Sequence, residues 1–360
     1  MTEAKAVTLD TGRFKVGDDH PSYFIADIAA NHDGDLSRAK ELIHLCAEAG
    51  ANAAKFQNFQ AATIVSDYGF KALGGQQSHQ AAWKKSVFDV YADASLPMHW
   101  TAELKACCDE AGIDYFTSPY DLKMLQDLSQ YVAAWKLGSG DITWHSSIEA
   151  MAKDGKPFFM ATGAATMEEV EAAVAVAKAH TDKLCVMQCN TNYTASVENF
   201  HHIALNVLKS YATAFPDVVL GLSDHTPGHA TVLGAVALGA RAVEKHFTDD
   251  MGREGPDHKF SMDPTSWRDM VDRTRELEAA LGPSEKRVMD NETKTVVLQR
   301  RAIRTTRALS AGDVLEEADL FPLRPCPPEG LPPYRTPELV GRTLTRAVAD
   351  GDIVTFDDLT

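Results

Sequence analysis

The sequence lacks long apolar runs and has little cysteine for its length. Six cysteines are scattered through 360 residues, without a CxxC pair or a dense disulfide-type pattern. The first residues have no apolar core of the signal-peptide type. No stretch approaches the roughly 18 uninterrupted apolar residues of a membrane span. These absences argue against a disulfide framework, a structural zinc site and a membrane protein, and they predict a soluble cytoplasmic protein with reduced thiols.

Basic residues are also in short supply. Lys and Arg number 35 against 51 Asp and Glu, which gives a formal charge of −16. Phosphate affinity comes mainly from clustered Lys and Arg, so a broad surface for nucleic acid or anionic membrane is excluded, whereas a local pocket for a small anion is compatible with this balance. Hydrophobic residues at 44% and charged residues at 24% are typical of a globular chain and exclude wholesale disorder.

What the sequence does have is a regular alternation of strand-type and helix-type runs. The helix-type runs include 35–50 and 166–180, the second of which begins with a capping-box spacing. Eight such units predict a (β/α)₈ barrel, and a doubly wound open sheet is the main alternative. No GxGxxG follows the first strand, which favours the barrel. The expected strands are 23–30, 53–59, 114–119, 133–140, 157–163, 183–190, 218–224 and 242–248.

Two segments depart from this alternation. Residues 60–98 are longer than a simple βα loop and are expected to add a helix around Ala81–Tyr91 near the barrel mouth. The sequence thus predicts a barrel domain over 1–282, a polar linker over 283–299 and a small β-rich domain over 300–360. A domain of about 60 residues is marginal alone, so we expect it to pack against another surface.

Polar residues recur where the expected strands end, which is where α/β barrels carry their chemistry. Lys55 and Lys136 occupy matching positions on two strands, and lysine is rarely buried without a partner. With neighbouring hydroxyls they predict a small-anion site, of phosphate plus carboxylate character. The hydroxyls are those of Ser118, Ser139 and Ser223.

Two histidines end adjacent strands. His225 and His246 could share a metal ion, although a single strand-end histidine is more often a hydrogen-bonding residue. With only two evident protein ligands and no thiolate nearby, an open, water-rich site suits Mn²⁺ or Mg²⁺ better than structural zinc.

Several phrases taken together resemble one family, and the resemblance covers almost the whole chain. In order they are ADIAANHDGDL, AAKFQNF, FTSPYD, WKLGSGD, ATGA, GLSDHT, GAVALGARAVEKHFT and GPDHKFSM. They are similar to the pattern of the N-acetylneuraminate (sialic acid) synthases and their legionaminic and pseudaminic acid relatives. Residues 300–360 resemble the SAF, or antifreeze-like, domain of that family.

The resemblance implies condensation of phosphoenolpyruvate (PEP) with an open-chain, N-acetylmannosamine-like aldose. A nine-carbon 2-keto-3-deoxy acid and phosphate would be the products. It also implies Mn²⁺, with Mg²⁺ or Co²⁺ as substitutes, held by His225 and His246, and a domain-swapped homodimer in which Arg324 reaches the partner's barrel. The matching PEP positions are Lys55, Ser118, Lys136, Ser139, Thr191 and Ser223, and the matching sugar positions are Gln57, Asp141, Tyr193, Asp257 and Arg324.

Asp27 matches a strand-end acidic residue that would handle a proton or the attacking water, alongside Lys55 and Lys136. Asp27 and Asp141 stand where glutamate is usual, and CNTNYTAS replaces the family's tyrosine-proline pattern. These departures lie beside the acceptor, so the sugar is the open question. The alternatives are condensation with a different aldose, as in heptulosonate and octulosonate phosphate synthases, and a non-catalytic carbohydrate-binding relative.

Overall fold

The computed structural model describes residues 7–74, 76, 80–81 and 83–360. The chain forms two compact units, residues 1–282 and residues 283–360.

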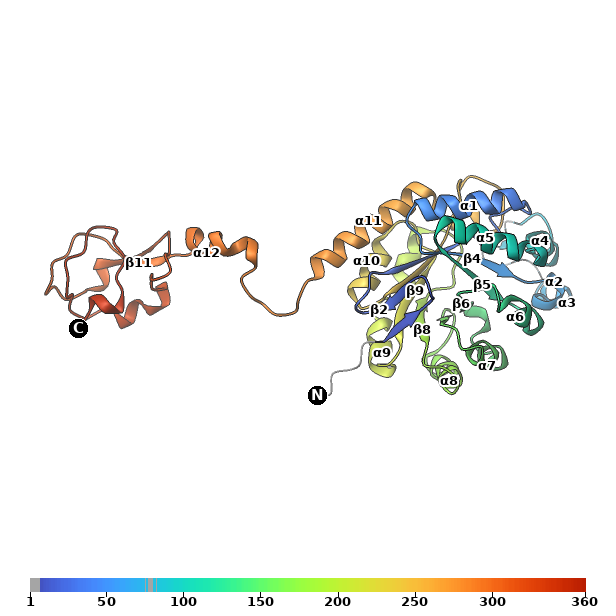
Figure 1. The fold of residues 1–360 in the computed structure, drawn as a ribbon, viewed down its shortest axis with the longest axis horizontal. Coiled ribbons are helices and arrows are strands. Elements are labelled where there is room, and N and C mark those ends of the chain that lie inside the picture. The colour runs from blue at the N-terminus through green and yellow to red at the C-terminus, as the bar shows by residue number, and fades with distance from the viewer. Residues whose placement is uncertain (1–6, 75, 77–79, 82) are drawn as a thin grey trace. The chain divides into compact units, whose positions relative to one another are not determined.

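The first unit is a closed barrel of eight parallel strands, as expected from the sequence (Figure 1). The strands follow one another around the ring in chain order, and the last pairs with the first. The predicted barrel is therefore confirmed over the open sheet. The strands are β3 (Tyr23–Asp27), β4 (Ala53–Asn58), β5 (Asp114–Pro119), β6 (Ala134–Leu137), β7 (Phe158–Ala161), β8 (Leu184–Cys189), β9 (Val219–Asp224) and β10 (Ala242–His246).

Helices surround this ring and begin where their capping residues predict. Asp35 caps α1 by accepting the backbone N–H groups of Ser37 and Arg38. Thr166 and Glu169 form the expected reciprocal capping box at α8. The helices of the ring are α1 (Leu36–Glu48), α5 (Thr101–Ala111), α6 (Leu122–Leu128), α7 (His145–Lys153), α8 (Met167–Lys178), α9 (Val207–Ala214), α10 (Ala230–Ala237) and α11 (Pro264–Leu281).

The segment after β4 contains three further helices, α2 (Ala61–Ile64), α3 (Asp67–Ala72) and α4 (Val87–Ala94). The helix expected around Ala81–Tyr91 is present as α4 but begins later. Ser86 accepts the backbone N–H of Asp89 at 3.1 Å and so fixes the start of α4 at Val87. Part of the expected range, residue 82, lies outside the described residues.

A short N-terminal hairpin, β1 (Thr8–Asp10) and β2 (Lys15–Gly17), is an element that the sequence patterns did not predict. Leu9 and Val16 are fully buried and pack with the apolar residues inside the barrel, among them Tyr23. Tyr23 lies at the N-terminal end of β3, so the hairpin covers the N-terminal end of the barrel. Active sites of such barrels lie at the opposite, C-terminal end.

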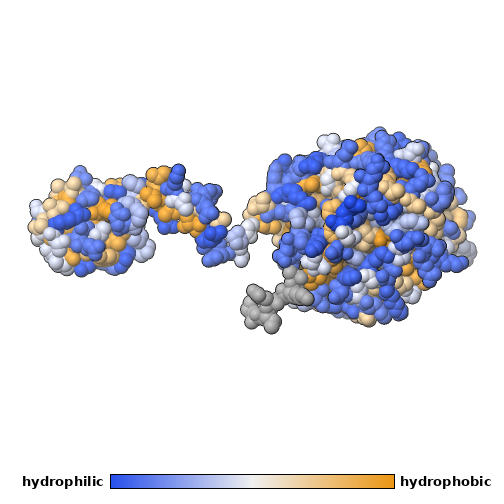
Figure 2. All heavy atoms as spheres, in the orientation of Figure 1, coloured by the Kyte–Doolittle hydropathy of each residue, from blue (hydrophilic) through white to orange (hydrophobic). Residues whose placement is uncertain are grey.

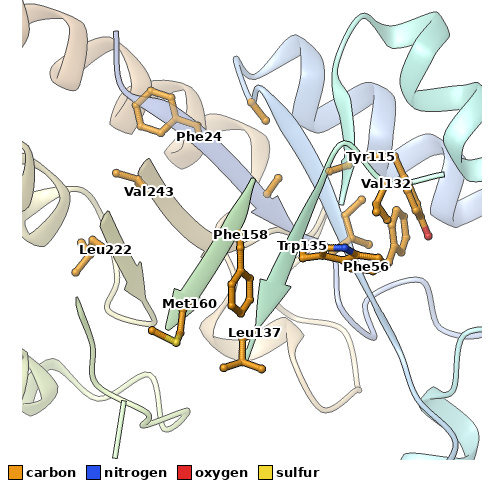
Figure 3. Packing of buried hydrophobic residues seen from close by; sticks show 14 of the residues in the cluster. Phe24, Phe56, Tyr115, Val132, Trp135, Leu137, Phe158, Met160, Leu222 and Val243 are labelled. Atoms are coloured by element: carbon orange, nitrogen blue, oxygen red, sulfur yellow. The ribbon is translucent and has the colours of Figure 1, made fainter. Parts of the chain in front are cut away.

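Two apolar layers make up the core of the barrel unit. The outer one lies between strands and helices and includes Phe56, Trp135 and Phe158 (Figure 3). The inner one includes Ala53, Phe116 and Ala134. Side chains alternate across a strand, so the inward residue two positions further on belongs to the next layer. In that layer the side chains turn polar, and the site begins there.

The second unit contains α12 (Thr293–Gln299), β11 (Ala302–Thr305) and β12 (Leu320–Leu323), joined by short turns and isolated bridges. A small core of its own holds it together, with Ile303, Leu339 and Val354 fully buried. Apolar side chains nevertheless reach its surface, as Figure 2 shows for the visible face. Phe321 and Tyr334 are 53% and 81% exposed. Within the described part of the chain, no helix combines the length and apolar character needed to cross a bilayer.

Candidate active site

Four charged side chains form a buried layer at the C-terminal end of the barrel. Lys55 of β4 and Lys136 of β6 are each 2% exposed, and so is Asp27 of β3, while Glu244 of β10 is 4% exposed. Charges at this depth require partners. The layer has two ammonium groups and two carboxylates, so the structure brings both predicted lysines together with the counter-charges they need.

Asp27 is the hub of one half of this layer. One carboxylate oxygen accepts hydrogen bonds from Lys55 Nζ at 2.6 Å and Gln57 Nε2 at 3.1 Å, and lies 3.4 Å from His246 Nε2. The other oxygen accepts the backbone N–H of Ala29 at 3.1 Å. Asp27 thus connects groups predicted for PEP, sugar and metal, which places it at the meeting point of all three.

Glu244 is the hub of the other half, and its role was not predicted. Oε1 lies 3.2 Å from Lys136 Nζ and accepts the Ser223 hydroxyl at 3.1 Å, while Oε2 lies 3.8 Å from Lys55 Nζ. Burial lowers the pKa of Lys55, but the carboxylates of Asp27 and Glu244 outweigh it and raise that pKa above its ordinary value. Both lysines therefore have a carboxylate partner within the pocket.

The predicted hydroxyl donors lie at the C-terminal ends of the strands of the same barrel, on or just after β5, β6, β8 and β9. Ser118 Oγ is buried without a hydrogen-bond partner among the described residues. Ser139 Oγ accepts the backbone N–H of Gly163 at 3.0 Å. A Cβ built on Gly163 would come within 1.9 Å of Thr191 Oγ1 and 2.9 Å of Ser139 Oγ. Thr191 and Ser139 therefore face the same glycine, and only a glycine leaves them room.

The two predicted metal-binding histidines lie side by side, with ring centroids 5.4 Å apart. His225 Nδ1 is 3.2 Å from the carbonyl oxygen of Asn190. Burial, with His225 as a neighbour, holds the pKa of His246 well below its usual range and so keeps its ring neutral. Cys189 lies against His225, which corrects the expectation that no thiolate is near the histidines. Burial lowers the pKa of His225, but the hydrogen bond and charge of Cys189 outweigh it and raise that pKa. Burial raises the pKa of Cys189, but the same contact with His225 outweighs it and lowers that pKa.

These residues fit a metal ion with open coordination positions. His246 Nδ1 is buried without a hydrogen-bond partner in the described chain, and a neutral imidazole is the form that binds metal. No group of three or more His, Cys, Asp or Glu among the described residues is arranged to hold a metal. Two imidazoles would leave the other coordination positions of the ion to water or substrate. Such an open site suits a hydrated ion such as Mn²⁺ better than it suits structural zinc.

Three of the predicted sugar-binding residues, Asp141, Tyr193 and Asp257, lie at the same end of the barrel as the charged layer. Asp257 accepts the backbone N–H of Ala30 at 3.1 Å. Burial, then the nearby charge of Asp27, raises the pKa of Asp257 to about 6. Burial also raises the pKa of Asp141. The ring of Tyr193 packs edge-on against His225 with centroids 4.4 Å apart, so a residue predicted for the sugar contacts one predicted for the metal.

Two tyrosines at the mouth were missed by the sequence analysis. Burial raises the pKa of Tyr91, on α4, and the carboxylates of Asp257 and Asp141 raise it further, so its hydroxyl lies near both. The pKa of Tyr120 is raised well above its usual range by burial and by Asp141. Phe59 packs between them, with centroids 5.4 Å from Tyr91 and 6.1 Å from Tyr120. For Tyr91, the unusual length of 60–98 was the available signal.

Other polar residues at the strand ends lie outside the pocket. Asp224 and Lys245 form a buried ion pair at 2.5 Å, and Asp224 also accepts the hydroxyls of Thr226 and Thr231. They alternate along β9 and β10 with Ser223 and Glu244, so they face the surrounding helices. Arg324 follows β12 in the second unit, where its side chain is exposed.

The comparisons with known proteins identify the family of the chain and agree with its fold. Residues 42–286 match the model of the NeuB family, and residues 300–360 match the SAF domain. The chain is 32% identical to the N,N'-diacetyllegionaminic acid synthase of Legionella pneumophila, over 94% of each chain. It is 30% identical to the human N-acetylneuraminate-9-phosphate synthase, over 96% of this chain and 94% of that one.

A solved structure shows the same fold. The N-acetylneuraminic acid synthetase of Leptospira borgpetersenii, in complex with citrate, superposes with a TM-score of 0.70 at 26% identity, over 81% of this chain and 95% of that one. The matched NeuB model covers more than half of the present sequence. With its eight-stranded barrel and SAF domain, the chain belongs to the NeuB family of sialic-acid-type synthases.

Proposed function

We propose that the protein condenses PEP with an open-chain N-acetylmannosamine-like aldose to give a nine-carbon 2-keto-3-deoxy acid and phosphate. The observation that carries this proposal is the pair of buried lysines, each 2% exposed, at the mouth of the barrel. A buried ammonium group is expensive unless it serves a ligand or a partner. Two of them, with serine hydroxyls beside them, form a pocket for a compact, multiply charged anion such as PEP.

In this proposal the chain binds PEP by charge and by hydroxyl donors. Lys55 and Lys136 supply two positive charges, and Ser118 Oγ supplies a donor that has no partner among the described residues. Ser139, Thr191 and Ser223 complete the donor set around the anion. Binding would hold C3 of PEP against the aldehyde carbon, which turns a bimolecular encounter into a positioned one.

The reaction balances with one molecule of water. A bond forms between C3 of PEP and the aldehyde carbon, whose oxygen takes up a proton. Water adds to C2, and the bond between C2 and the bridging oxygen then breaks to release phosphate. Asp27 is placed to hold the water or receive its proton, because it already joins Lys55, Gln57 and His246. A metal on His225 and His246 would polarise the aldehyde oxygen as a Lewis acid.

The acceptor side favours an unphosphorylated sugar. Asp141 and Asp257 both lie there, with Tyr91, Tyr120 and Tyr193 as neighbours. Carboxylates repel a second phosphate but accept hydrogen bonds from sugar hydroxyls, while tyrosines pack against C–H faces and acetamido methyl groups. This chemistry supports an acetamido sugar over the phosphorylated aldoses of heptulosonate-type synthases.

The test is phosphate release from PEP with Mn²⁺ across a panel of acceptors, followed by mass analysis of the acid formed. The panel is N-acetylmannosamine, mannose, arabinose 5-phosphate and 2,4-diacetamido-trideoxyhexoses. Chelator-sensitive release with one acetamido sugar would support the proposal and identify the acceptor. Release only with the sugar phosphate would redirect it to a different aldose, and PEP binding without release would favour a non-catalytic carbohydrate-binding protein.

The homodimer belongs to the same proposal. The second unit exposes Phe321 and Leu323 immediately before Arg324, at 53% and 41%. An arginine rimmed by exposed apolar residues is typical of an interface that delivers a charge to a partner. We therefore assign Arg324 to the sugar site of the partner subunit.

A single methyl group added to the pocket is expected to weaken PEP binding. Gly163→Ala would force its Cβ against Thr191 Oγ1 and Ser139 Oγ. We expect the KM for PEP to rise by roughly five- to 150-fold, which corresponds to the roughly 1–3 kcal/mol that overpacking costs. Gly140→Ala is the matched control, because its Cβ would have nothing within 4 Å. Equal PEP KM values for the two variants would contradict the assignment of Thr191 and Ser139.

Acceptor binding is expected to weaken as the pH falls through about 6. Burial and Asp27 raise the pKa of Asp257 to about 6, so its carboxylate is ionised above that pH and protonated below it. Since the sugar would donate to the carboxylate, the acceptor KM should rise at low pH at saturating metal and PEP. Asp257→Asn should have a high acceptor KM that no longer follows this step. An unchanged pH profile in that variant would remove Asp257 from the sugar site.

A further inference from the structure

Glu244 is a buried carboxylate with an unusual position. It lies on the inner face of β10, contacts both lysines of the pocket and belongs to none of the predicted ligand sets. Its Oε2 has no hydrogen-bond partner among the described residues. The carboxylate of Glu244 lies within 4 Å of both ammonium groups that are proposed to bind an anion. Its negative charge therefore weakens the binding of that anion.

The charges of the pocket show what Glu244 does. Within the buried layer, the two carboxylates of Asp27 and Glu244 face the two ammonium groups of Lys55 and Lys136, so these four charges balance one another. The two carboxylates approach the lysines to different distances. Asp27 lies 2.6 Å from Lys55, whereas Glu244 lies 3.2 Å from Lys136 and 3.8 Å from Lys55. Lys136 Nζ also donates to the carbonyl oxygen of Leu137 at 3.0 Å. An ammonium group has three donors, so these contacts fix Lys136 and still leave a donor for an anion.

We propose that Glu244 is a positioning residue for the two lysines and a fixed counter-charge that limits the affinity of the pocket for phosphate. This inference rests on the proposed function, in which phosphate is both part of the substrate and a product. Without the counter-charge, two buried ammonium groups would hold released phosphate tightly and slow its departure. With it, Lys55 and Lys136 bind PEP at a set position, and the pocket still lets the product leave.

The test is binding of inorganic phosphate and of PEP to Glu244→Gln by calorimetry, without acceptor. Glutamine keeps the size and removes the charge, so phosphate should bind at least about tenfold more tightly, as expected for a unit charge lost a few ångströms away in a buried site. The KM for PEP should fall while kcat also falls. Glu244→Asp keeps the charge and should retain near-native phosphate affinity. A residue with a merely structural role would weaken binding or leave it unchanged.

Asp224→Asn is the matched control. It removes a buried carboxylate from the same pair of strands, but on the outer face, where it contacts Lys245. It should lower thermal stability without tightening phosphate binding. Unchanged or weaker phosphate affinity in a folded Glu244→Gln would overturn the inference while leaving the PEP reaction standing. Failure of the wild type to bind either anion would overturn both.

Discussion

His225→Gln is expected to abolish metal-dependent turnover while leaving the fold intact. Glutamine is polar and of similar size, and His225 lies at the end of β9, where an outward network of Asp224, Thr226 and Lys245 holds the backbone. Losing the Lewis acid should remove several kcal/mol of transition-state stabilisation, which is about a thousandfold or more in rate. Phosphate release at increasing Mn²⁺ concentration would measure the loss of turnover. Calorimetric titration with Mn²⁺ would measure the loss of metal binding.

His229→Gln is the control for this variant. His229 is four residues along the same loop, but its side chain is partly exposed and pairs with Asp269 at 3.0 Å. It should retain both Mn²⁺ affinity and turnover. Native-like circular dichroism with lost metal binding in His225→Gln would support the metal assignment. If His225→Gln depended on Mn²⁺ in the same way as the wild type, the assignment of His225 as a metal ligand would be refuted.

Deletion of residues 300–360 is expected to abolish activity even though the barrel unit folds. The barrel has its own closed sheet and core, so the truncated protein should keep its secondary structure and its affinity for PEP. It would lack Arg324, which in the proposed dimer reaches the partner's barrel. Arg324→Ala should reproduce most of the loss, and the exposed Arg300→Ala should not. A fully active truncated barrel would contradict the swapped dimer.

Mixed dimers distinguish a swapped cap from a cap within one chain. The Arg324→Ala variant has an intact barrel and a defective SAF domain (residues 300–360), which is called the cap here. The Lys136→Met variant has a defective barrel and an intact cap. If each cap serves the partner's barrel, co-expressing the two inactive variants should restore about a quarter of wild-type activity, since half of the dimers would contain one complete site. No recovery, with mixed dimers demonstrated, would place Arg324 in its own chain's site or outside the site.

The barrel could be predicted because its signal is repeated. Each expected run contains one observed strand, and caps at Asp35 and Thr166 fix the helix starts. The N-terminal hairpin escaped because its two strands have three residues each, too few to show an alternation. The late start of α4 escaped because Ser86 competes with earlier possible helix starts, and only its bond to Asp89 decides.

Part of the site could be predicted, for a related reason. Polar residues ending buried strands identify the pocket, which is how Lys55 and Lys136 were found. The same pattern does not tell which polar residues face inward, so Glu244 and Lys245, adjacent in the chain, could not be separated. Tyr91 comes from an insertion whose path no periodicity specifies. Such residues become visible only when strand register and loop path are known.

The measurement that most directly tests the account is the fate of the bridging oxygen of PEP. Labelled with ¹⁸O at that position and incubated with Mn²⁺ and the acceptor sugar, PEP should yield labelled phosphate and an equal amount of unlabelled nine-carbon keto acid. Phosphate should not form when the sugar is omitted. Label retained in the organic product, or phosphate released at the same rate without any sugar, would contradict a PEP-condensing synthase.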